Sequence, residues 1–89
     1  MLTKVTRVEA IGDFHLRTHF SDGSCGEHDF SALAHKPGEM LMPLRDPSYF
    51  ARVFLEDGAP TWPNGYDIAP EWLRREMEAA GELHRAAAE

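Results

Sequence analysis

Apolar and polar side chains alternate strictly along residues 14–20. Every second position from Phe14 to Phe20 is apolar or threonine, and histidine or arginine stands between them. Because successive side chains point to opposite faces of a strand, this pattern predicts a strand with one buried and one solvent-exposed face. Upstream, Thr6, Val8 and Ala10 predict a second strand, joined to the first through a short loop at residues 11–13.

A third strand is predicted after a hairpin turn at residues 21–23, in which Gly23 takes the left-handed conformation. This turn places Arg17 opposite Glu27, and each pair of opposite charges facing across two strands contributes about 0.2–1 kcal/mol. A shift by one residue would move the apolar side chains to the wrong face. Gly26 is expected to allow the close approach of a neighbouring segment. The remaining pairs of this register are Phe14 with Phe30, His15 with Asp29, Leu16 with His28, Thr18 with Gly26, His19 with Cys25 and Phe20 with Ser24.

The middle of the chain predicts a short helix and a second hairpin. Asp46 followed by Pro47 is typical of the N-cap and first position of a helix. Residues 53–56 and 60–62 predict two short strands around an Asp-Gly turn. The apolar run at residues 40–44 contains Pro43, which is incompatible with a central strand or a helix interior. We therefore expect this run to lie across the sheet.

A C-terminal helix is predicted to begin at Pro70 and to end at Gly81. Charged pairs four residues apart stabilise its polar face. Its apolar face, with Trp72 expected in the core, is formed by Trp72, Leu73, Met77 and Ala80. The charged pairs are Glu71 with Arg75 and Arg74 with Glu78.

These elements predict the α+β class. We expect a small antiparallel sheet, made of an N-terminal three-stranded meander and a second short hairpin, with one short middle helix and one C-terminal helix. A chain of 89 residues fits one domain, which we expect at residues 1–81. Residues 82–89 have little to bury and predict a frayed or disordered tail.

Charge and composition restrict the cellular setting. The chain carries 9 Lys and Arg against 15 Asp and Glu, a net charge of -6. Because phosphate binding requires clustered basic side chains, nonspecific DNA or RNA binding is disfavoured. No apolar run reaches the ~20 residues that cross a bilayer, and the first residues lack the apolar stretch of a signal peptide. A single cysteine, Cys25, is typical of a reducing compartment. We expect a cytoplasmic protein that does not bind membranes.

Several short motifs occur in an order that resembles the bacterial family known as domain of unknown function 2442, over about residues 5–73. The resemblance implies a small bacterial protein without an established activity. Some relatives are fused to a helix-turn-helix module, and some are encoded beside a second small protein, as in toxin and antitoxin pairs. The motifs are Phe20-Ser21-Asp22-Gly23, Asp29-Phe30-Ser31, Leu44-Arg45-Asp46-Pro47, Trp62-Pro63-Asn64-Gly65 and Asp67-Ile68-Ala69-Pro70.

The chain departs from that family in two respects. Ala69 stands where the family usually has serine, and losing a capping hydroxyl costs roughly 0.5–2 kcal/mol. We expect Asp67 to substitute as the cap. Because little sequence follows the last helix, the DNA-binding function of the fused relatives is not expected here.

Three residues are candidate ligands for a metal ion: His15, His19 and Cys25. The predicted register puts them on one face of the sheet, and imidazole and thiolate groups bind zinc. The same register puts His19 opposite Cys25, where an imidazole can activate a thiol as a nucleophile. However, a hairpin turn explains the two glycines beside Cys25. No Cys-x-x-Cys motif is present, and no His-x-x-x-His pair falls on a predicted helix. We assign no catalytic residue, no cofactor and no physiological metal.

An interaction surface is the stronger functional signal, with Met40, Leu41, Met42, Trp62 and Tyr66 as its candidate residues. Methionine and aromatic side chains are enriched at protein interfaces. We interpret the chain as a non-enzymatic bacterial interaction or regulatory domain with a protein partner or a homodimeric contact, antitoxin-like in a two-protein system. Two alternatives stay open: a DNA-binding regulator that acts as an oligomer, and a hydrolase that depends on a metal or on the cysteine.

Overall fold

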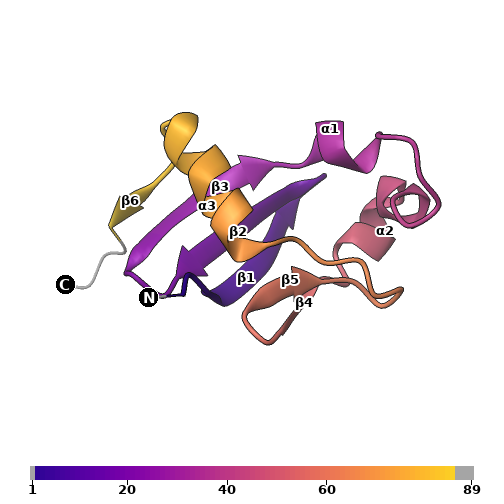
Figure 1. Ribbon diagram of the computed structural model, residues 1–89. Coiled ribbons are helices and arrows are strands. Elements are labelled where there is room, and N and C mark those ends of the chain that lie inside the picture. The colour runs from indigo at the N-terminus through magenta and orange to yellow at the C-terminus, as the bar shows by residue number, and fades with distance from the viewer. Residues whose placement is uncertain (1, 86–89) are drawn as a thin grey trace.

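A four-stranded antiparallel sheet forms one layer of the molecule, and helices pack on one of its faces (Figure 1). The computed structural model describes residues 2–85. The first sheet has the order β1-β2-β3-β6, and β4 pairs with β5 in a separate hairpin, so the class is α+β as predicted. The strands are β1 Val5–Gly12, β2 His15–Phe20, β3 Ser24–Asp29, β4 Phe54–Glu56, β5 Ala59–Thr61 and β6 His84–Arg85. The helices are α1 Ser31–Ala34, a 3-10 helix Met42–Arg45, α2 Pro47–Phe50 and α3 Pro70–Ala79.

The predicted register between β2 and β3 is confirmed. Arg17 lies opposite Glu27, and its Nη2 donates a hydrogen bond to Glu27 Oε2 at 2.8 Å. Leu16 and Thr18 are fully buried on the other face, while Arg17 is exposed. Gly23 has a φ of 91°, the left-handed conformation that the turn requires. The other pairs are His15 with Asp29, Leu16 with His28, Thr18 with Gly26 and His19 with Cys25.

The first hairpin turns one residue later than the sequence predicts. β1 continues through Gly12, and Asp13 and Phe14 form the turn, so β2 begins at His15 rather than Phe14. Phe14 has a φ of 62°, which is uncommon for a residue with a side chain. Its ring packs edge-on against Phe50, with the centroids 5.6 Å apart. The Phe14 carbonyl also accepts a hydrogen bond from the Phe30 amide at 2.6 Å, so both its side chain and its backbone hold Phe14 in the turn.

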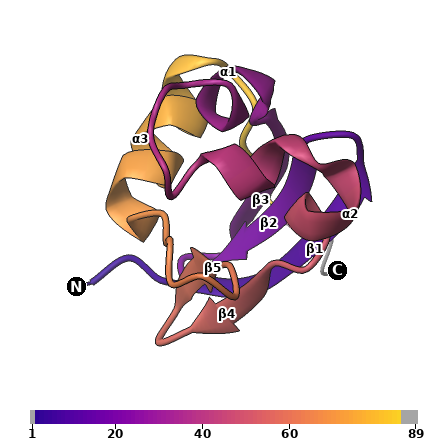
Figure 2. The same ribbon diagram turned by 90° about the vertical axis from the view of Figure 1, so that its right-hand side faces the viewer.

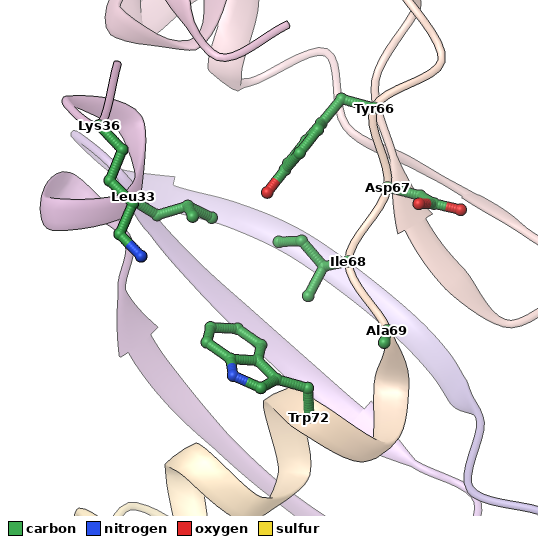
Figure 3. Close-up of a pocket in the computed structure, with 7 residues that line it drawn as sticks. All are labelled: Leu33, Lys36, Tyr66, Asp67, Ile68, Ala69 and Trp72. Atoms are coloured by element: carbon green, nitrogen blue, oxygen red, sulfur yellow. The ribbon is translucent and has the colours of Figure 1, made fainter. Parts of the chain in front are cut away.

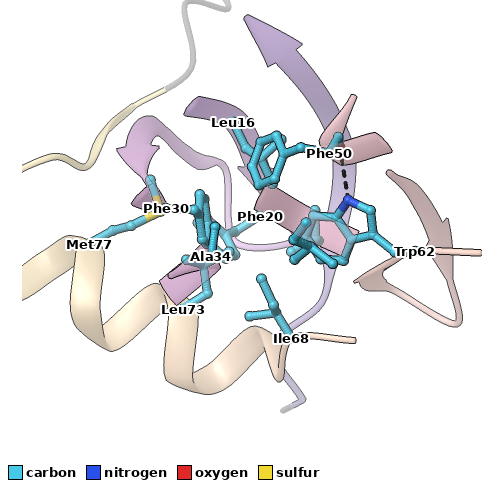
Figure 4. Packing of buried hydrophobic residues seen from close by; sticks show 11 residues of the cluster. Leu16, Phe20, Phe30, Ala34, Phe50, Trp62, Ile68, Leu73 and Met77 are labelled. Atoms are coloured by element: carbon cyan, nitrogen blue, oxygen red, sulfur yellow. Dashed lines mark hydrogen bonds between the residues drawn. The ribbon is translucent and has the colours of Figure 1, made fainter. Parts of the chain in front are cut away.

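The core lies between the sheet and the helices, and it includes Trp62 and Phe50 (Figure 4). Their ring centroids are 5.5 Å apart, and Trp62 Nε1 donates a hydrogen bond to the Phe50 carbonyl at 2.8 Å. A buried N–H without such a partner would cost about 1–3 kcal/mol. This bond therefore fixes the end of α2 against the segment that follows β5.

The sequence predicts that the run at residues 40–44 lies across the sheet, and this prediction was wrong. Residues 42–45 form a 3-10 helix, in which only Leu44 is fully buried. Met40 and Met42 are 45% and 55% exposed. Pro43 is compatible with this helix because it lies in the first turn, where a backbone N–H would have no hydrogen-bond partner within the helix. The following cap is confirmed, since Asp46 Oδ1 accepts a hydrogen bond from the Ser48 amide at 3.0 Å.

The last helix, α3, lies on the sheet face that carries the core, as Figure 2 shows from the side. It ends in a Schellman motif: Gly81 has a φ of 72° and donates to the Glu78 carbonyl, and the Glu82 amide donates to the Met77 carbonyl. At the other end, Ala69 occupies the N-cap without a side-chain hydrogen bond. The expected cap at Asp67 does not form: the N-cap position is two residues later, at Ala69, and Asp67 pairs with Thr61 in an isolated bridge.

After α3 the chain returns to the sheet, in a segment where the sequence predicts a frayed or disordered tail. His84 and Arg85 pair with Cys25 and Ser24 of β3 as strand β6. Gly26 allows this return, because a Cβ there would lie 2.3 Å from the Glu82 carbonyl oxygen. The neighbour that the sequence predicts at Gly26 is therefore the chain's own C-terminal segment. The remainder of the expected tail, residues 86–89, lies outside the described residues.

A charged contact ties α3 to the turn between β2 and β3. Arg74 Nε donates to Asp22 Oδ2 at 2.8 Å, and Arg74 Nη1 donates to Glu78 at 3.1 Å, which confirms the predicted pair within the helix. The Ser24 hydroxyl and amide both donate to Asp22 and, with Arg74, lower its pKa to about 2. Among residues 2–85, no helix is long and apolar enough to span a membrane.

Candidate functional site

Two adjacent pockets share Leu33, Lys36 and Trp72, and together they form a surface groove that we call the Trp72 groove. The first pocket has a volume of about 280 Å³, and Tyr66 and Ile68 complete its apolar wall (Figure 3). The second pocket has a volume of about 190 Å³ and lies between α1, the end of β3 and α3. The shared residues therefore separate two neighbouring hollows on one surface.

Trp72 reaches this surface because of its phase on α3. Leu73 and Met77 are one helical turn apart and fully buried. Trp72 precedes Leu73 and is rotated by about 100° from it, since an α-helix has 3.6 residues per turn. Its side chain consequently lies at the border of the buried stripe and is 37% exposed. The prediction that Trp72 belongs to the core was wrong.

The opposite wall of the groove comes from α1, a four-residue helix that the sequence analysis did not anticipate. The core holds α1 at both ends, because the preceding residue Phe30 and the last residue Ala34 are buried. Leu33 is half-buried and lines the groove together with Trp72. The Ser31 amide donates to Asp29 Oδ1 at 2.9 Å. That hydrogen bond lowers the pKa of Asp29 and keeps its carboxylate ionised at the start of the helix.

Tyr66 is held over the first pocket by the Asn64 turn. Asn64 Oδ1 accepts a hydrogen bond from the Tyr66 amide, and Asn64 Nδ2 donates to the Met40 carbonyl at 3.0 Å. The Tyr66 carbonyl accepts from the Trp62 amide at 2.9 Å. Partial burial raises the pKa of the Tyr66 phenol. Figure 3 shows the phenol oxygen directed into the pocket, so Tyr66 offers a neutral hydroxyl there.

Charge is distributed unevenly between the two pockets. Asp67 borders the first pocket, but Figure 3 shows its carboxylate directed away from Trp72. Asp29 and Glu76 both line the second pocket, but Asp29 Oδ2 lies 3.9 Å from His15 Nε2, which belongs to the sheet face away from α3. Among the described residues, neither Glu76 nor the Lys36 shared by both pockets has an ion-pair partner. The first pocket is thus mainly apolar, and the second is lined by one acidic and one basic side chain without ion-pair partners, Glu76 and Lys36.

The five interaction candidates fall into four environments. Trp62 is fully buried in the core and is not available at the surface, because its indole satisfies the Phe50 carbonyl. Leu41 is half-buried and packs against the core. Met40 and Met42 are exposed, and Tyr66 lines the first pocket. The sequence analysis missed Leu33, Lys36 and Trp72, and the phase of Trp72 beside Leu73 is the signal that could have revealed it.

The metal candidates lie on the solvent-exposed face of the sheet, on the far side from α3. His19 faces Cys25 across β2 and β3, and His84 of β6 lies on the other side of Cys25. The Cys25 Sγ is 3.7 Å from His84 Nδ1, a contact that the sequence analysis did not predict. His15 lies apart from them, opposite Asp29 at the other end of the strand pair. Within residues 2–85, no three His, Cys, Asp or Glu side chains lie close enough to hold a metal ion.

Comparison with known protein families places residues 5–79 in the family described as "Protein of unknown function (DUF2442)". No curated protein and no solved structure matches the chain. The family resemblance that the motif order indicates is confirmed. The matched segment begins with the first residue of β1 and ends with the last residue of α3, and the chain therefore belongs to the DUF2442 family of proteins of unknown function.

Proposed function

We propose that the chain is a non-enzymatic interaction domain that holds one partner protein in the Trp72 groove, as an antitoxin-like member of a bacterial two-protein system. The observation that carries the proposal is the exposed indole of Trp72 beside Leu33, between two hollows of about 280 and 190 Å³. Tryptophan is enriched among the residues that dominate binding energy at protein interfaces. A tryptophan at the border of a pocket is therefore the best-supported anchor for a partner.

The rigidity of the groove supports a role in recognition. Its two walls are anchored by the core residues Phe30, Leu73 and Met77, each at most 1% exposed. A preformed site loses less conformational entropy on binding than a flexible one. The exposed Met40 and Met42 adjoin the Asn64 turn that holds Tyr66, and they extend the proposed contact surface.

The proposal is tested by affinity capture from the native host with four versions of the chain: wild type, Trp72→Lys, Met42→Lys and Phe54→Lys. Phe54 is the matched control, because it is an aromatic residue that is 43% exposed on β4 and lines neither pocket. We expect one protein to be recovered in a fixed ratio with the wild type and the Phe54 variant, and to be lost with the Trp72 variant. Circular dichroism of each variant verifies that the fold is retained.

Three outcomes would contradict the proposal. If no protein is recovered in a fixed ratio, the chain has no stable partner. If the Trp72 variant recovers the partner as well as the wild type does, the partner does not bind in the Trp72 groove. Loss with Met42→Lys alone would move the contact to the run at residues 40–42. In parallel, binding to DNA from the gene's own upstream region is measured at two salt concentrations, because specific, salt-sensitive binding would support a DNA-binding regulator instead.

A further inference from the structure

We infer that Asn64 is a site of spontaneous chemical modification, where loss of ammonia converts the asparagine to aspartate or isoaspartate and releases residues 40–42 from the Asn64 turn. No partner protein is needed for this conversion, which is separate from the proposed function. Asn64 is the only asparagine in the sequence, which contains no glutamine. It is followed by Gly65, whose missing Cβ leaves the backbone nitrogen accessible to the neighbouring side chain.

The reaction at Asn64 consumes water and produces ammonia. The Gly65 nitrogen attacks Asn64 Cγ, the new C–N bond closes a succinimide ring, and the Cγ–Nδ2 bond breaks. Ammonia leaves with the proton that the Gly65 nitrogen loses. Water then opens the ring at the side-chain carbonyl, which gives aspartate, or at the main-chain carbonyl, which gives isoaspartate. Both residues are exposed, and a Cβ built at Gly65 meets no atom within 4 Å, so water can reach the ring.

The folded turn slows ring closure because it holds the attacking nitrogen in a hydrogen bond. The Gly65 amide donates to the Trp62 carbonyl at 2.8 Å, which closes the Asn64 turn. Pro63 occupies the second position of this turn and Asn64 has no left-handed φ, as in a type I turn. The succinimide ring brings the Gly65 nitrogen next to Asn64 Cγ, so the peptide between them must rotate out of the turn. The reaction therefore proceeds through local opening of the chain.

The product cannot restore the contact with Met40. Asn64 supplies both a donor and an acceptor, since its Nδ2 donates to the Met40 carbonyl at 3.0 Å and its Oδ1 accepts from the Tyr66 amide at 3.1 Å. An aspartate carboxylate supplies acceptors only, so it keeps the contact with Tyr66 and repels the Met40 carbonyl oxygen. Isoaspartate adds a methylene group to the main chain and displaces Gly65 as well. Either product separates residues 40–42 from the turn that positions Tyr66.

Mass spectrometry of the full chain, incubated at mildly alkaline pH, measures the reaction at Asn64 directly. Because no other side chain is a carboxamide, conversion makes the intact chain heavier by about 1 Da and releases one ammonia. The Asp-Gly pairs at residues 22–23 and 57–58 can also form the ring, but they lose water and regain it without a change in mass. We expect the folded chain to react at least about 10-fold more slowly than the chain in guanidinium chloride, since opening the turn breaks hydrogen bonds.

A second measurement tests whether the turn controls the rate. The Tyr49 hydroxyl accepts a hydrogen bond from the Asn64 amide at 2.9 Å, and Tyr49→Phe removes this acceptor. We expect this variant to react about 3-fold faster than the wild type when folded, and at the wild-type rate in denaturant. Tyr66→Phe is the matched control, because among residues 2–85 the Tyr66 hydroxyl has no hydrogen bond to Asn64.

Amide hydrogen exchange in Asn64→Asp measures the consequence of the conversion. The Leu41 and Met42 amides, which donate to the Gly38 carbonyl, report on the released segment. We expect their exchange to accelerate by about 3- to 10-fold in Asn64→Asp, and by less in Asn64→Ala, which removes the donor without adding a charge. Equal rates of ammonia loss in the folded and denatured wild type, no mass gain in denaturant, or unchanged exchange in Asn64→Asp would each overturn the inference and leave the proposed function intact.

Discussion

Replacing Gly26 with alanine would place a methyl group where the C-terminal segment passes closest to the sheet. The new Cβ would lie 2.3 Å from the Glu82 carbonyl oxygen and 3.0 Å from Met77 Cε. The methionine side chain can rotate away, but the carbonyl belongs to a backbone held by the Schellman motif, in which the Glu82 amide donates to the Met77 carbonyl. Residues 82–85 must therefore move away from β3 to accommodate the methyl group.

The expected cost follows from two opposing effects. Overpacking a closely packed contact costs about 1–3 kcal/mol, while replacing glycine with alanine recovers about 0.4–1 kcal/mol by restricting the unfolded chain. We expect Gly26→Ala to lower the free energy of unfolding by about 1–2 kcal/mol. For a domain of this size, each kcal/mol lowers Tm by roughly 4–8 °C.

Urea unfolding followed by circular dichroism measures this loss, with Gly12→Ala as the control. Nothing lies within 4 Å of a Cβ built at Gly12, which does not have a left-handed φ. We expect the control to match or slightly exceed wild-type stability. Amide hydrogen exchange should show reduced protection at β6 in Gly26→Ala only. Wild-type stability in Gly26→Ala, with protection retained at β6, would refute the packing of the C-terminal segment against β3.

Two substitutions and one labelling experiment test other contacts. Ala69→Ser should raise the free energy of unfolding by about 0.5–2 kcal/mol, because the N-cap of α3 has no side-chain hydrogen bond and an extended backbone that suits a capping hydroxyl. An unchanged urea midpoint would contradict this expected gain in stability. The pKa of Asp22 falls from 3.8 to about 2 on folding, so its contribution to stability is complete above pH 3.8 and is lost as the pH falls towards 2. The stability difference between wild type and Asp22→Asn should therefore narrow over that range; a gap independent of pH would contradict the assignment. Cys25 is 6% exposed and lies between His19 of β2 and His84 of β6. Iodoacetamide should therefore label it slowly in the folded chain and at the ordinary rate in urea. Rapid labelling of the folded chain would support the cysteine-dependent hydrolase instead.

The sheet could be predicted because its sequence signals are local and agree with one another. Alternation from residue 14 onwards identifies the buried face, and the Arg17–Glu27 pair selects the register that the structure contains. The caps at Asp46 and Gly81 are also local, since each depends on residues within one helical turn.

The groove could not be predicted because it depends on contacts between distant segments. Trp62 and Trp72 exchange their expected roles: the hydrogen bond to Phe50 draws Trp62 into the core, and helical phase leaves Trp72 at the surface. Helix α1 is too short for a period to be visible in the sequence. Strand β6 contains two residues and forms only because Gly26 leaves room for Glu82.

The contrast between the two tryptophans allows one direct measurement of whether a partner occupies the Trp72 groove. Iodide quenching of tryptophan fluorescence reports exposure, and Trp62 is fully buried while Trp72 is 37% exposed. In the free chain, quenching should therefore come from Trp72 and disappear in Trp72→Phe. The captured partner is then added in a form that contains no tryptophan, with any tryptophans replaced. The Trp72 emission should shift to shorter wavelength and become protected from iodide. A complex in which Trp72 is quenched as strongly as in the free chain would contradict the proposal.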